Sequence, residues 1–383
     1  MQFLTEYGLF LAKVITIVFA ILMIIGAIAR SRHRHHAPDA PGEIEVRNLS
    51  DEYKDLKDTM QIEVLDAEAY KVLRKAEEKK EKAEAKEKKK AAKLLKKKVA
   101  EQLADDAEES SSENDTTETE DDDEELSRKP RMFVLNFIGD MEASSVHCLR
   151  EEITAILSIA EPEHGDEVVL RLDSPGGVVH GYGHAAAQLQ RLRDAEIPLT
   201  VSVDEVAASG GYMMACVADK IIAAPFAIVG SIGVIAELPN FNRLMKRFDI
   251  DYEQHTAGQF KRTLSVFGAN SDEGRRKFQQ ELEDTHVLFK AFVSHYRPKL
   301  ELDKVATGEH WYGSQAVSLQ LVDELKTSDA YLLEHYESHD VFEVNYEFKK
   351  SLADKLSLAS FLTLDRLMKA WYQRLSNRSN FVR

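Results

Sequence analysis

The sequence predicts an α/β domain that follows an N-terminal apolar segment and a long charged region. Three observations lead to this expectation. Short apolar runs alternate with helix-like segments from residue 131 onward, the first thirty residues are largely apolar, and the charges between these parts lie in blocks. Strands that alternate with helices at this spacing are typical of parallel βαβ-type units. The 383 residues have room for one large domain or two ordinary ones.

The apolar segment at residues 9–29 is interrupted by only two polar side chains. At 1.5 Å per residue it would span about 30 Å, the thickness of a bilayer's hydrocarbon core. A cleavable signal peptide carries its positive charge before a shorter apolar run, whereas three arginines follow the run here. We therefore expect a retained single-pass anchor at residues 1–30, with the lipid bilayer as a partner, and a juxtamembrane segment at residues 31–66.

The charged region has two parts of opposite sign. Residues 67–103 are rich in Lys, Glu and Ala without Gly or Pro, and pairs such as Glu78 with Lys82 support an exposed helix. This helix lacks the aromatic interleaving of nucleic-acid-binding proteins, so we expect no nucleic-acid partner. Residues 104–130 are acidic and rich in Ser and Thr, which predicts a disordered linker. Because the blocks partly cancel, the net charge of -16 describes neither part.

Residues 131–345 are expected to form the packed domain. Its predicted strands are 132–138, 167–172, 198–203 and 220–223, and its predicted helices are 146–159, 181–194, 209–218 and 270–296, the last as one helix or a broken pair. The two cysteines, Cys148 and Cys216, lie in apolar surroundings and are interpreted as core thiols, with a disulfide between them left open.

Two glycine-rich turns are the places where chemistry is expected. In Asp173–Gly177 the glycines allow the backbone to approach a ligand closely and to present its N–H groups. In Ala207–Tyr212 small residues flank Ser209 at a strand-to-helix turn, which leaves room for a reactive oxygen and places an N–H beside it. Ser209 is thus a candidate nucleophile, although such a serine can also be a simple helix N-cap.

A serine hydroxyl needs a base to remove its proton. No histidine lies between the serine turn and His255. His180 and His184 stand one helical turn apart, but no nearby Glu or Cys completes a ligand set, so we expect neither a metal nor another cofactor. A lysine can replace histidine when burial leaves it neutral. Lys261, which follows a strand-like segment, is the candidate.

Five motifs in order give the domain a resemblance to the signal peptide peptidase A (protease IV) family of serine peptidases. They are DSPGG at 173–177, ASGGY at 208–212, GSIGV at 230–234, the segment around Lys261, and GEHWYGSQA at 308–316. The resemblance covers about residues 131–325. It implies a ClpP/crotonase-like spiral of ββα units.

The resemblance also implies the site. Ser209 would be the nucleophile and Lys261 its base, while Ser231 orients the lysine and Gly176 and Gly210 present N–H groups to the oxyanion. The implied activity is that of a membrane-anchored serine endopeptidase. It would hydrolyse membrane-derived or unfolded, signal-peptide-like substrates through an acyl-enzyme.

One position departs from the family pattern. Where the family often has Gly-Leu-Val-Asp, residues 320–323 read Gln-Leu-Val-Asp. That turn must either take another shape or hold Gln320 in a left-handed conformation.

Two other functions are compatible with parts of the sequence. A crotonase-like acyl-CoA protein would use the glycine N–H groups without a nucleophile, and the pairing of Ser209 with Lys261 argues against it. A non-enzymatic membrane scaffold would use the charged region and leave the two residues idle.

Membrane topology is open to two arguments. Arg30, Arg32 and Arg34 follow the apolar segment, and the positive-inside rule then places the rest of the chain in the cytoplasm. The resemblance favours the outer face of the bacterial cytoplasmic (inner) membrane. The charge argument uses this chain's own residues and is slightly preferred.

The sequence also allows predictions about the C-terminal tail and about the oligomeric state. Residues 346–383 form an amphipathic pattern that suits docking on the domain or contact with a membrane surface. One serine turn and one candidate lysine leave no internal repeat. The resemblance therefore implies a homo-oligomeric ring, an octamer in relatives, whose neighbouring subunits share each site.

Overall fold

The computed structural model of the protein describes residues 42–76, 79 and 128–348. Apart from its outermost strand ends, this part belongs to one compact unit, Ile44–Tyr346. The expected anchor, most of the charged region and the tail after residue 348 lie outside the described residues. Within the described ranges, no helix has both the length and the apolar character needed to cross a bilayer. Residues 67–76 are helical, as expected for the start of the Lys/Glu-rich segment.

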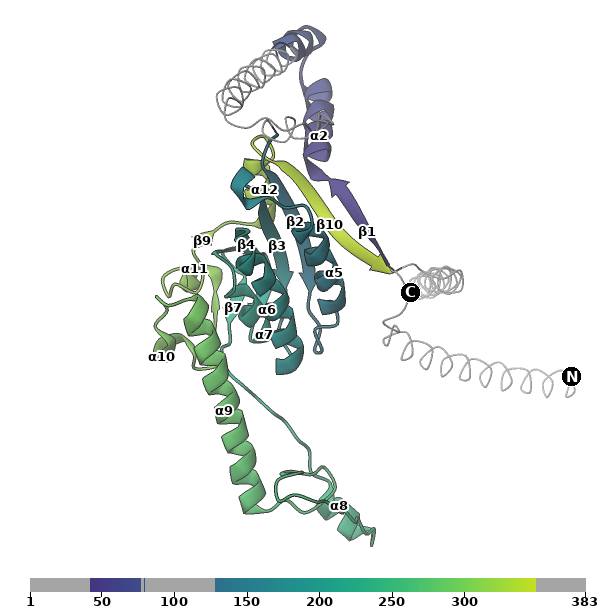
Figure 1. Ribbon diagram of the computed structural model, residues 1–383, viewed down its shortest axis with the longest axis vertical. Coiled ribbons are helices and arrows are strands. Elements are labelled where there is room, and N and C mark those ends of the chain that lie inside the picture. Colours follow the sequence, from purple (N-terminus) through teal and green to yellow (C-terminus); the bar gives the residue numbers. More distant parts are fainter. Residues whose placement is uncertain (1–41, 77–78, 80–127, 349–383) are drawn as a thin grey trace, which may run out of the picture. The chain divides into compact units, whose positions relative to one another are not determined.

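A seven-stranded sheet forms the centre of the unit, in the order β1-β10-β2-β3-β4-β6-β9 (Figure 1). Its strands are β1 (Gly42–Asn48), β2 (Arg131–Ile138), β3 (Glu167–Asp173), β4 (Leu199–Val203), β6 (Lys220–Ala223), β9 (Glu324–Leu325) and β10 (Asp340–Phe348). All neighbouring pairs from β10 to β9 run parallel. Parallel strands covered on both faces have nearly continuous apolar sequences. The expected strands in residues 131–223 are therefore confirmed.

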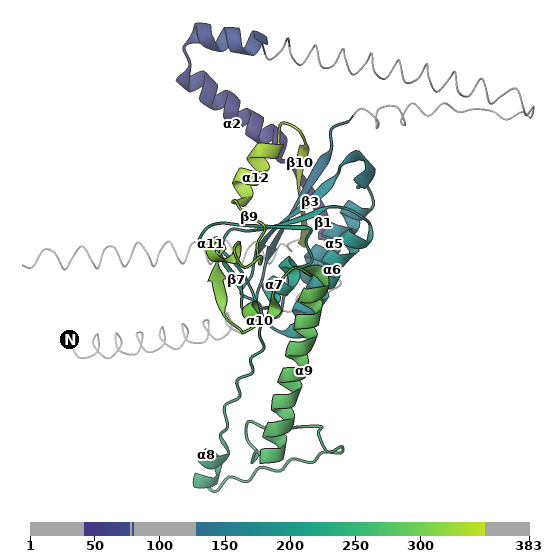
Figure 2. The ribbon, with the colours of Figure 1, turned by 90° about the vertical axis from the view of Figure 1, so that its left-hand side faces the viewer.

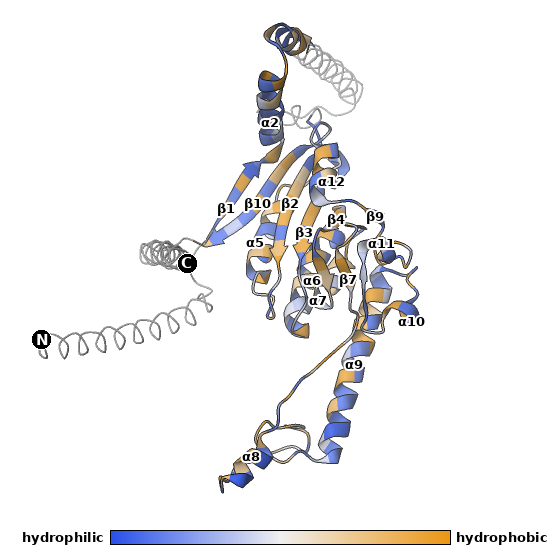
Figure 3. Cartoon of the chain, turned by 180° about the vertical axis from the view of Figure 1, so that it is seen from behind, coloured by the Kyte–Doolittle hydropathy of each residue, from blue (hydrophilic) through white to orange (hydrophobic). Residues whose placement is uncertain are grey.

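Helices cover both faces of this sheet. On one face lie α5 (Val146–Leu157), α6 (Val179–Asp194) and the short α7 (Gly210–Ala215), which bury the larger apolar core. On the other, α12 (Ser328–His335) and the start of α2 (Leu49–Val64) cover a smaller apolar cluster. Figure 3 shows β2 and β3 as largely hydrophobic along their length. The mixed α/β architecture is as expected.

A second, three-stranded sheet lies beside the first. It contains β5 (Val206–Ala208), β7 (Ile228–Gly230) and β8 (His310–Tyr312), with β7 parallel to β5 and antiparallel to β8. Gly230 has a φ of 96°, and a Cβ there would lie 2.8 Å from the Trp311 ring. The GSIGV and GEHWYGSQA motifs are thus packed against each other, which explains why glycine and tryptophan occur in them.

Beyond β7 the chain leaves the sheets and forms a projection, residues 235–274, that we call the arm. It contains α8 (Asn242–Arg247) and joins α9 (Asp272–Tyr296), which returns to the domain as one unbroken helix. In both views α8 lies beyond the N-terminal end of α9, away from the large sheet (Figures 1 and 2). Within the arm, Asn240 Nδ2 donates to the Ser265 and Gly268 carbonyl oxygens at 2.8 and 3.0 Å.

Several local features differ from the expectations or refine them. Strand β1 and helix α2 fall within residues 31–66, where no element of the domain was foreseen. Gln320 has a φ of 62°, so the left-handed alternative is the one adopted. Both cysteines are free, Cys216 buried and Cys148 half-buried. The remaining short elements are η1 (Pro162–His164), α10 (Leu302–Val305) and α11 (Gly313–Ala316).

Candidate active site

Ser209 occupies a sharp turn between β5 and α7. Its backbone has φ 52° and ψ -116°, a region in which a non-glycine residue costs on the order of 1–3 kcal/mol. The Ser209 N–H donates to the Gly230 carbonyl oxygen at 2.8 Å, which ties the turn to β7. Its side chain is half-buried. A strained strand-to-helix turn of this kind holds the nucleophilic serine of other hydrolases at an exposed point.

The two glycine-rich turns meet at Ser209. A Cβ added to Gly176, whose φ is 85°, would lie 2.8 Å from the Ser209 Cβ and 2.7 Å from the Gly210 nitrogen. The turns are held together by hydrogen bonds from the Ser174 N–H to the Val206 oxygen at 2.7 Å and from the Ala208 N–H to the Ser174 oxygen at 3.0 Å. The structure therefore brings Gly176, Ser209 and Gly210 together, and any side chain at residue 176 would collide with the turn.

Ser231 lies next to this group. It follows the last residue of β7, whose carbonyl accepts from Ser209, and its own N–H donates to the Glu309 oxygen at 2.7 Å. Ser231 also has a positive φ, 52°. Neither the Ser209 nor the Ser231 hydroxyl makes a hydrogen bond with another residue of the described chain.

Lys261 is not brought to Ser209 within this chain. It lies in the arm, between α8 and α9, and its side chain is exposed. The expected strand before it is absent, because residues 251–256 have no regular structure. That expectation was wrong: an alternating sequence forms a strand only where a neighbouring strand pairs with it. Within the described residues the Lys261 ammonium has no ion-pair or hydrogen-bond partner.

The arm that contains Lys261 exposes many large apolar side chains. They include Ile235, Phe241, Leu244, Phe248, Ile250, Tyr252, Phe260 and Phe267, with exposed fractions between 42% and 80%. Contiguous exposed apolar surface of this kind marks interaction sites in soluble domains.

Two buried side chains near the site were not predicted from the sequence to belong to it. Ser174 and Tyr182 are both 0% exposed, and their hydroxyl oxygens are 2.6 Å apart. A signal for Tyr182 was present in the sequence, because glycines on both sides of a helical tyrosine leave room for close backbone contacts. Glycine spacing alone could not show which backbone comes close.

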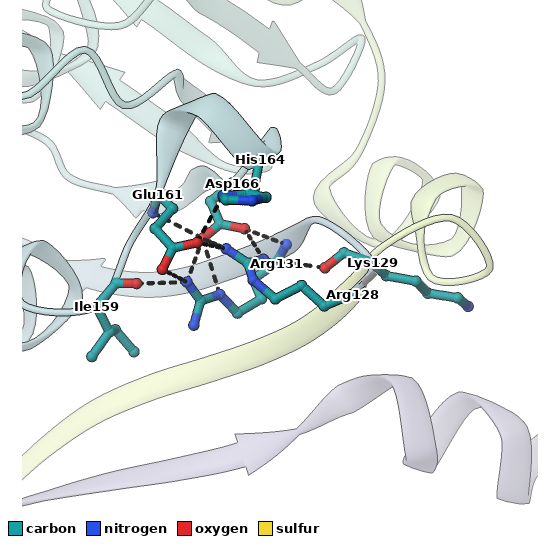
Figure 4. Close-up of polar contacts among 7 residues, drawn as sticks. All are labelled: Arg128, Lys129, Arg131, Ile159, Glu161, His164 and Asp166. Atoms are coloured by element: carbon teal, nitrogen blue, oxygen red, sulfur yellow. Dashed lines mark hydrogen bonds and ion pairs between the residues drawn. The ribbon is translucent and has the colours of Figure 1, made fainter. Parts of the chain in front are cut away.

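A dense polar cluster lies at the N-terminal end of β3, opposite the end that leads to this site. Figure 4 shows its members. Asp166, fully buried, accepts from Arg128 and Arg131 at 2.7 Å each, and Glu161 pairs with Arg128 at 2.6 Å. Burial alone would raise the pKa of Asp166, but hydrogen bonds from the two arginines and from backbone N–H groups lower it to about 2. A carboxylate so firmly ionised and paired is suited to structure, not to proton transfer. His180 and His184 are exposed, and the described residues hold no cluster of potential metal ligands.

A strained serine with two glycines packed beside it, on an α/β scaffold, is an arrangement found in serine hydrolases. The chain belongs to peptidase family S49: the N-terminal profile of the family matches residues 2–189 and its peptidase profile residues 191–341. The protein is accordingly a serine peptidase.

The relatives agree over nearly the whole chain. It is similar to the protease SohB of Haemophilus influenzae, with 49% identity over 352 residues, 92% of this chain and 91% of that protein. A SohB protein of Buchnera aphidicola subsp. Baizongia pistaciae is 37% identical over 381 residues, 99% of both chains. Among solved structures, the 1510-N membrane-bound stomatin-specific protease with a substrate peptide matches at 15% identity, covering 61% of this chain and 98% of that one, with a TM-score of 0.36. A likeness at this score carries no inference about activity.

Proposed function

We propose that the protein is a membrane-anchored serine endopeptidase in which Ser209 attacks the peptide carbonyl and Lys261 is the general base. The observation that carries the proposal is the strained Ser209 turn, which continues into Gly210 and has Gly176 packed against it. Backbone strain of this kind persists where the surrounding structure enforces it, and it gathers at functional sites. The substrates would be membrane-derived or unfolded, signal-peptide-like chains.

The chemistry follows from these positions. The Ser209 oxygen adds to the substrate carbonyl carbon while its proton passes to the base, and the carbonyl oxygen becomes an oxyanion. The N–H groups of Gly176 and Gly210 would stabilise that charge. Collapse releases the amine half of the substrate with the proton, and water then hydrolyses the acyl-enzyme. Ser231, one residue from the carbonyl that binds the Ser209 N–H, would orient the base.

Lys261 would reach the serine of a neighbouring copy of the chain. A lysine can act as a base only where burial favours its neutral form, and Lys261 is exposed in the single chain. The arm is exposed and apolar, which supports its burial against a second copy. A closed ring of such contacts is the usual outcome when each subunit contributes different halves of one site. The size of an octamer is implied by resemblance alone.

Two further parts of the proposal concern the architecture. The chain passes from β4 in the large sheet to β5 in the small sheet and then to α7, and from β6 to β7 in the same way. This repetition supports a ClpP/crotonase-like spiral of ββα units. The membrane anchor rests on residues 9–29, which lie outside the described residues.

A serine-directed fluorophosphonate probe tests the nucleophile. The detergent-solubilised full-length protein should be labelled on Ser209 and should cleave a signal-peptide-like substrate. Ser209→Ala should lose both properties with an unchanged unfolding temperature. Ser314→Ala, which alters an exposed serine bonded to the Pro225 oxygen at 3.1 Å, is the matched control and should keep both. Peptidase activity that survives in Ser209→Ala would disprove the assignment.

A further inference from the structure

A directed chain of hydrogen bonds runs behind the two glycine turns. The Gly176 N–H donates to Ser174 Oγ at 3.2 Å, Ser174 Oγ lies 2.6 Å from Tyr182 Oη, and Tyr182 Oη donates to the Asp140 carbonyl oxygen at 2.8 Å. A hydroxyl has a single proton to give. Because Tyr182 gives its proton to Asp140, Ser174 must donate to Tyr182 and accept from Gly176. The chain therefore fixes the orientation of the Gly176 peptide.

The ring of Tyr182 supports the other turn. A Cβ added to Gly210 would lie 2.3 Å from the Tyr182 Cγ, so the Gly210 backbone rests directly on the ring. Gly211 is equally close to Ser174, since a Cβ there would lie 2.5 Å from the Ser174 carbonyl oxygen. Burial raises the pKa of Tyr182, which keeps its hydroxyl protonated and able to donate at any pH of a peptidase assay. One side chain thus contacts both turns, through its ring and through its hydroxyl.

We propose that Tyr182 is a positioning residue: its ring holds the Gly210 N–H in place for the oxyanion, and its hydroxyl, bonded to Ser174 and Asp140, holds the ring. This inference rests on the proposed function, in which the Gly210 N–H stabilises the oxyanion. Donors of this kind are effective because they are held in place before the charge develops. In a buried chain, each hydrogen bond also polarises the next and so stiffens the whole.

Tyr182→Phe tests the hydroxyl, because it keeps the ring under Gly210. We expect kcat to fall about tenfold to a hundredfold, less than the roughly hundredfold to thousandfold loss that follows removal of a donor itself. KM should stay unchanged. The affinity for a peptide aldehyde, whose serine adduct has an oxyanion, should fall in parallel with kcat, while that for the matching peptide amide should not.

Tyr331→Phe is the control. Tyr331 is also buried, and its hydroxyl donates to Glu167 at the opposite end of β3 from the site, at 3.5 Å. It should keep wild-type kcat. An equal loss of kcat in both variants, or a loss of aldehyde and amide affinity together, would reduce Tyr182 to a purely structural role and overturn the proposal.

Ser174→Ala separates positioning from competition. If Ser174 helps to hold Tyr182 in place, kcat falls, and the double variant with Tyr182→Phe loses less than the product of the two single effects. A rise in kcat would instead mean that Ser174 competes with the oxyanion for the Gly176 N–H, which contradicts the proposal. If Tyr182→Phe does not fold, the comparison of kcat and KM is made with Ser174→Ala alone. Wild-type kinetics in Tyr182→Phe beside an inactive Ser209→Ala would reject the positioning role and leave the nucleophile intact.

Discussion

Asp166 shows how one side chain can join three segments of the fold. It accepts hydrogen bonds from the Arg128 and Arg131 side chains and from the backbone N–H groups of Arg131 and Glu161. A fully buried carboxylate is stable only when it is paired in this way, since its transfer from water is costly. Arg128 is one of the last three residues of the segment expected to be a disordered linker, residues 104–130, so Asp166 ties the end of that segment to the domain.

Replacing this carboxylate should destabilise the protein strongly. Asp166→Asn should lower the free energy of unfolding by about 3 kcal/mol, because two partly buried arginines lose their counter-charge. Asp272→Asn breaks an exposed pair with Arg275 and should cost less than about 0.5 kcal/mol. Urea unfolding at pH 7 compares the two variants. Equal stabilities would show that the cluster contributes no more than a surface ion pair.

The contribution of Asp166 to the stability of the fold depends on pH. Because folding lowers the pKa of Asp166 from 3.8 to about 2, its ionised form stabilises the fold above about pH 4, and that contribution is lost as the pH falls through about 2. Asp166→Asn should therefore lack this part of the acid sensitivity, as measured by urea unfolding between pH 2 and 5.

Helix α5 and strand β10 are joined by Glu152, a buried carboxyl group whose pKa is raised, in contrast to that of Asp166. Glu152 on α5 is 4% exposed and accepts from the Tyr346 N–H at 2.8 Å, while its second oxygen has no partner among the described residues. Burial raises the pKa of Glu152 to about 7, although the Tyr346 N–H acts in the other direction. The group is therefore a source of instability in alkaline solution.

Glu152→Gln should remove this instability in alkaline solution, because glutamine does not ionise. The stabilisation from protonated Glu152 is complete below pH 4.5 and is lost as the pH rises through about 7. At pH 8 the variant should be more stable than the wild type by about 2 kcal/mol, and near pH 4 the two should be equal. Glu151→Gln, on the exposed side of the same helix, is the control. A constant difference between the variant and the wild type at all pH values would exclude titration of Glu152 as its cause.

Elements with strong apolar periodicity were predictable from the sequence, and those that depend on distant partners were not. Strands β2, β3, β4 and β6 are buried on both faces and read as continuous apolar runs. Strand β1 is mostly exposed and has few apolar residues, so only its pairing with β10 defines it. The segment before Lys261 has alternating apolar and polar residues, but no neighbouring strand pairs with it, and it forms no strand.

The candidate site likewise has a part that the sequence predicted and a part that it did not. Ser209, Gly176 and Gly210 lie in short turns whose glycines reveal a close backbone approach, and these three do meet. The position of Lys261 depends on the arm, whose length and direction no local pattern encodes. Tyr182 escaped notice because its role arises from contacts with residues 28 and 42 positions away in the chain, at Gly210 and Asp140.

The assembly as a whole decides whether Ser209 and Lys261 can act together. Inactive Ser209→Ala and Lys261→Ala chains, mixed in detergent and allowed to exchange, should recover activity if neighbours share each site. Random mixing of equal amounts gives about a quarter of the sites one intact serine and one intact lysine, so about a quarter of wild-type activity is expected. Mass measurement must first verify that mixed oligomers have formed.

One control mixture makes the outcome decisive. A Ser209→Ala, Lys261→Ala double variant mixed with an equal amount of wild type should leave about a quarter of the sites intact if neighbours share each site, and about half if each chain has its own site. Recovery in the first mixture therefore reports complementary sites and not reactivated single chains. Verified mixed oligomers without activity would mean that the pair acts inside one chain, after the arm has folded back.

The order of strands in the large sheet bears on how the chain is made. Strand β2 stands between β3 and β10, and Asn136 in β2 bonds to Glu343, 207 positions later, at 2.9 Å. During synthesis, β2 emerges before β3 and can pair with it on one side, but its other edge waits for β10, the last strand described. An unpaired apolar edge is a template for aggregation, and distant pairings form slowly. Nascent chains of this protein thus spend most of their translation with an open edge, and ribosomes that stall before residue 340 should yield products that require a chaperone.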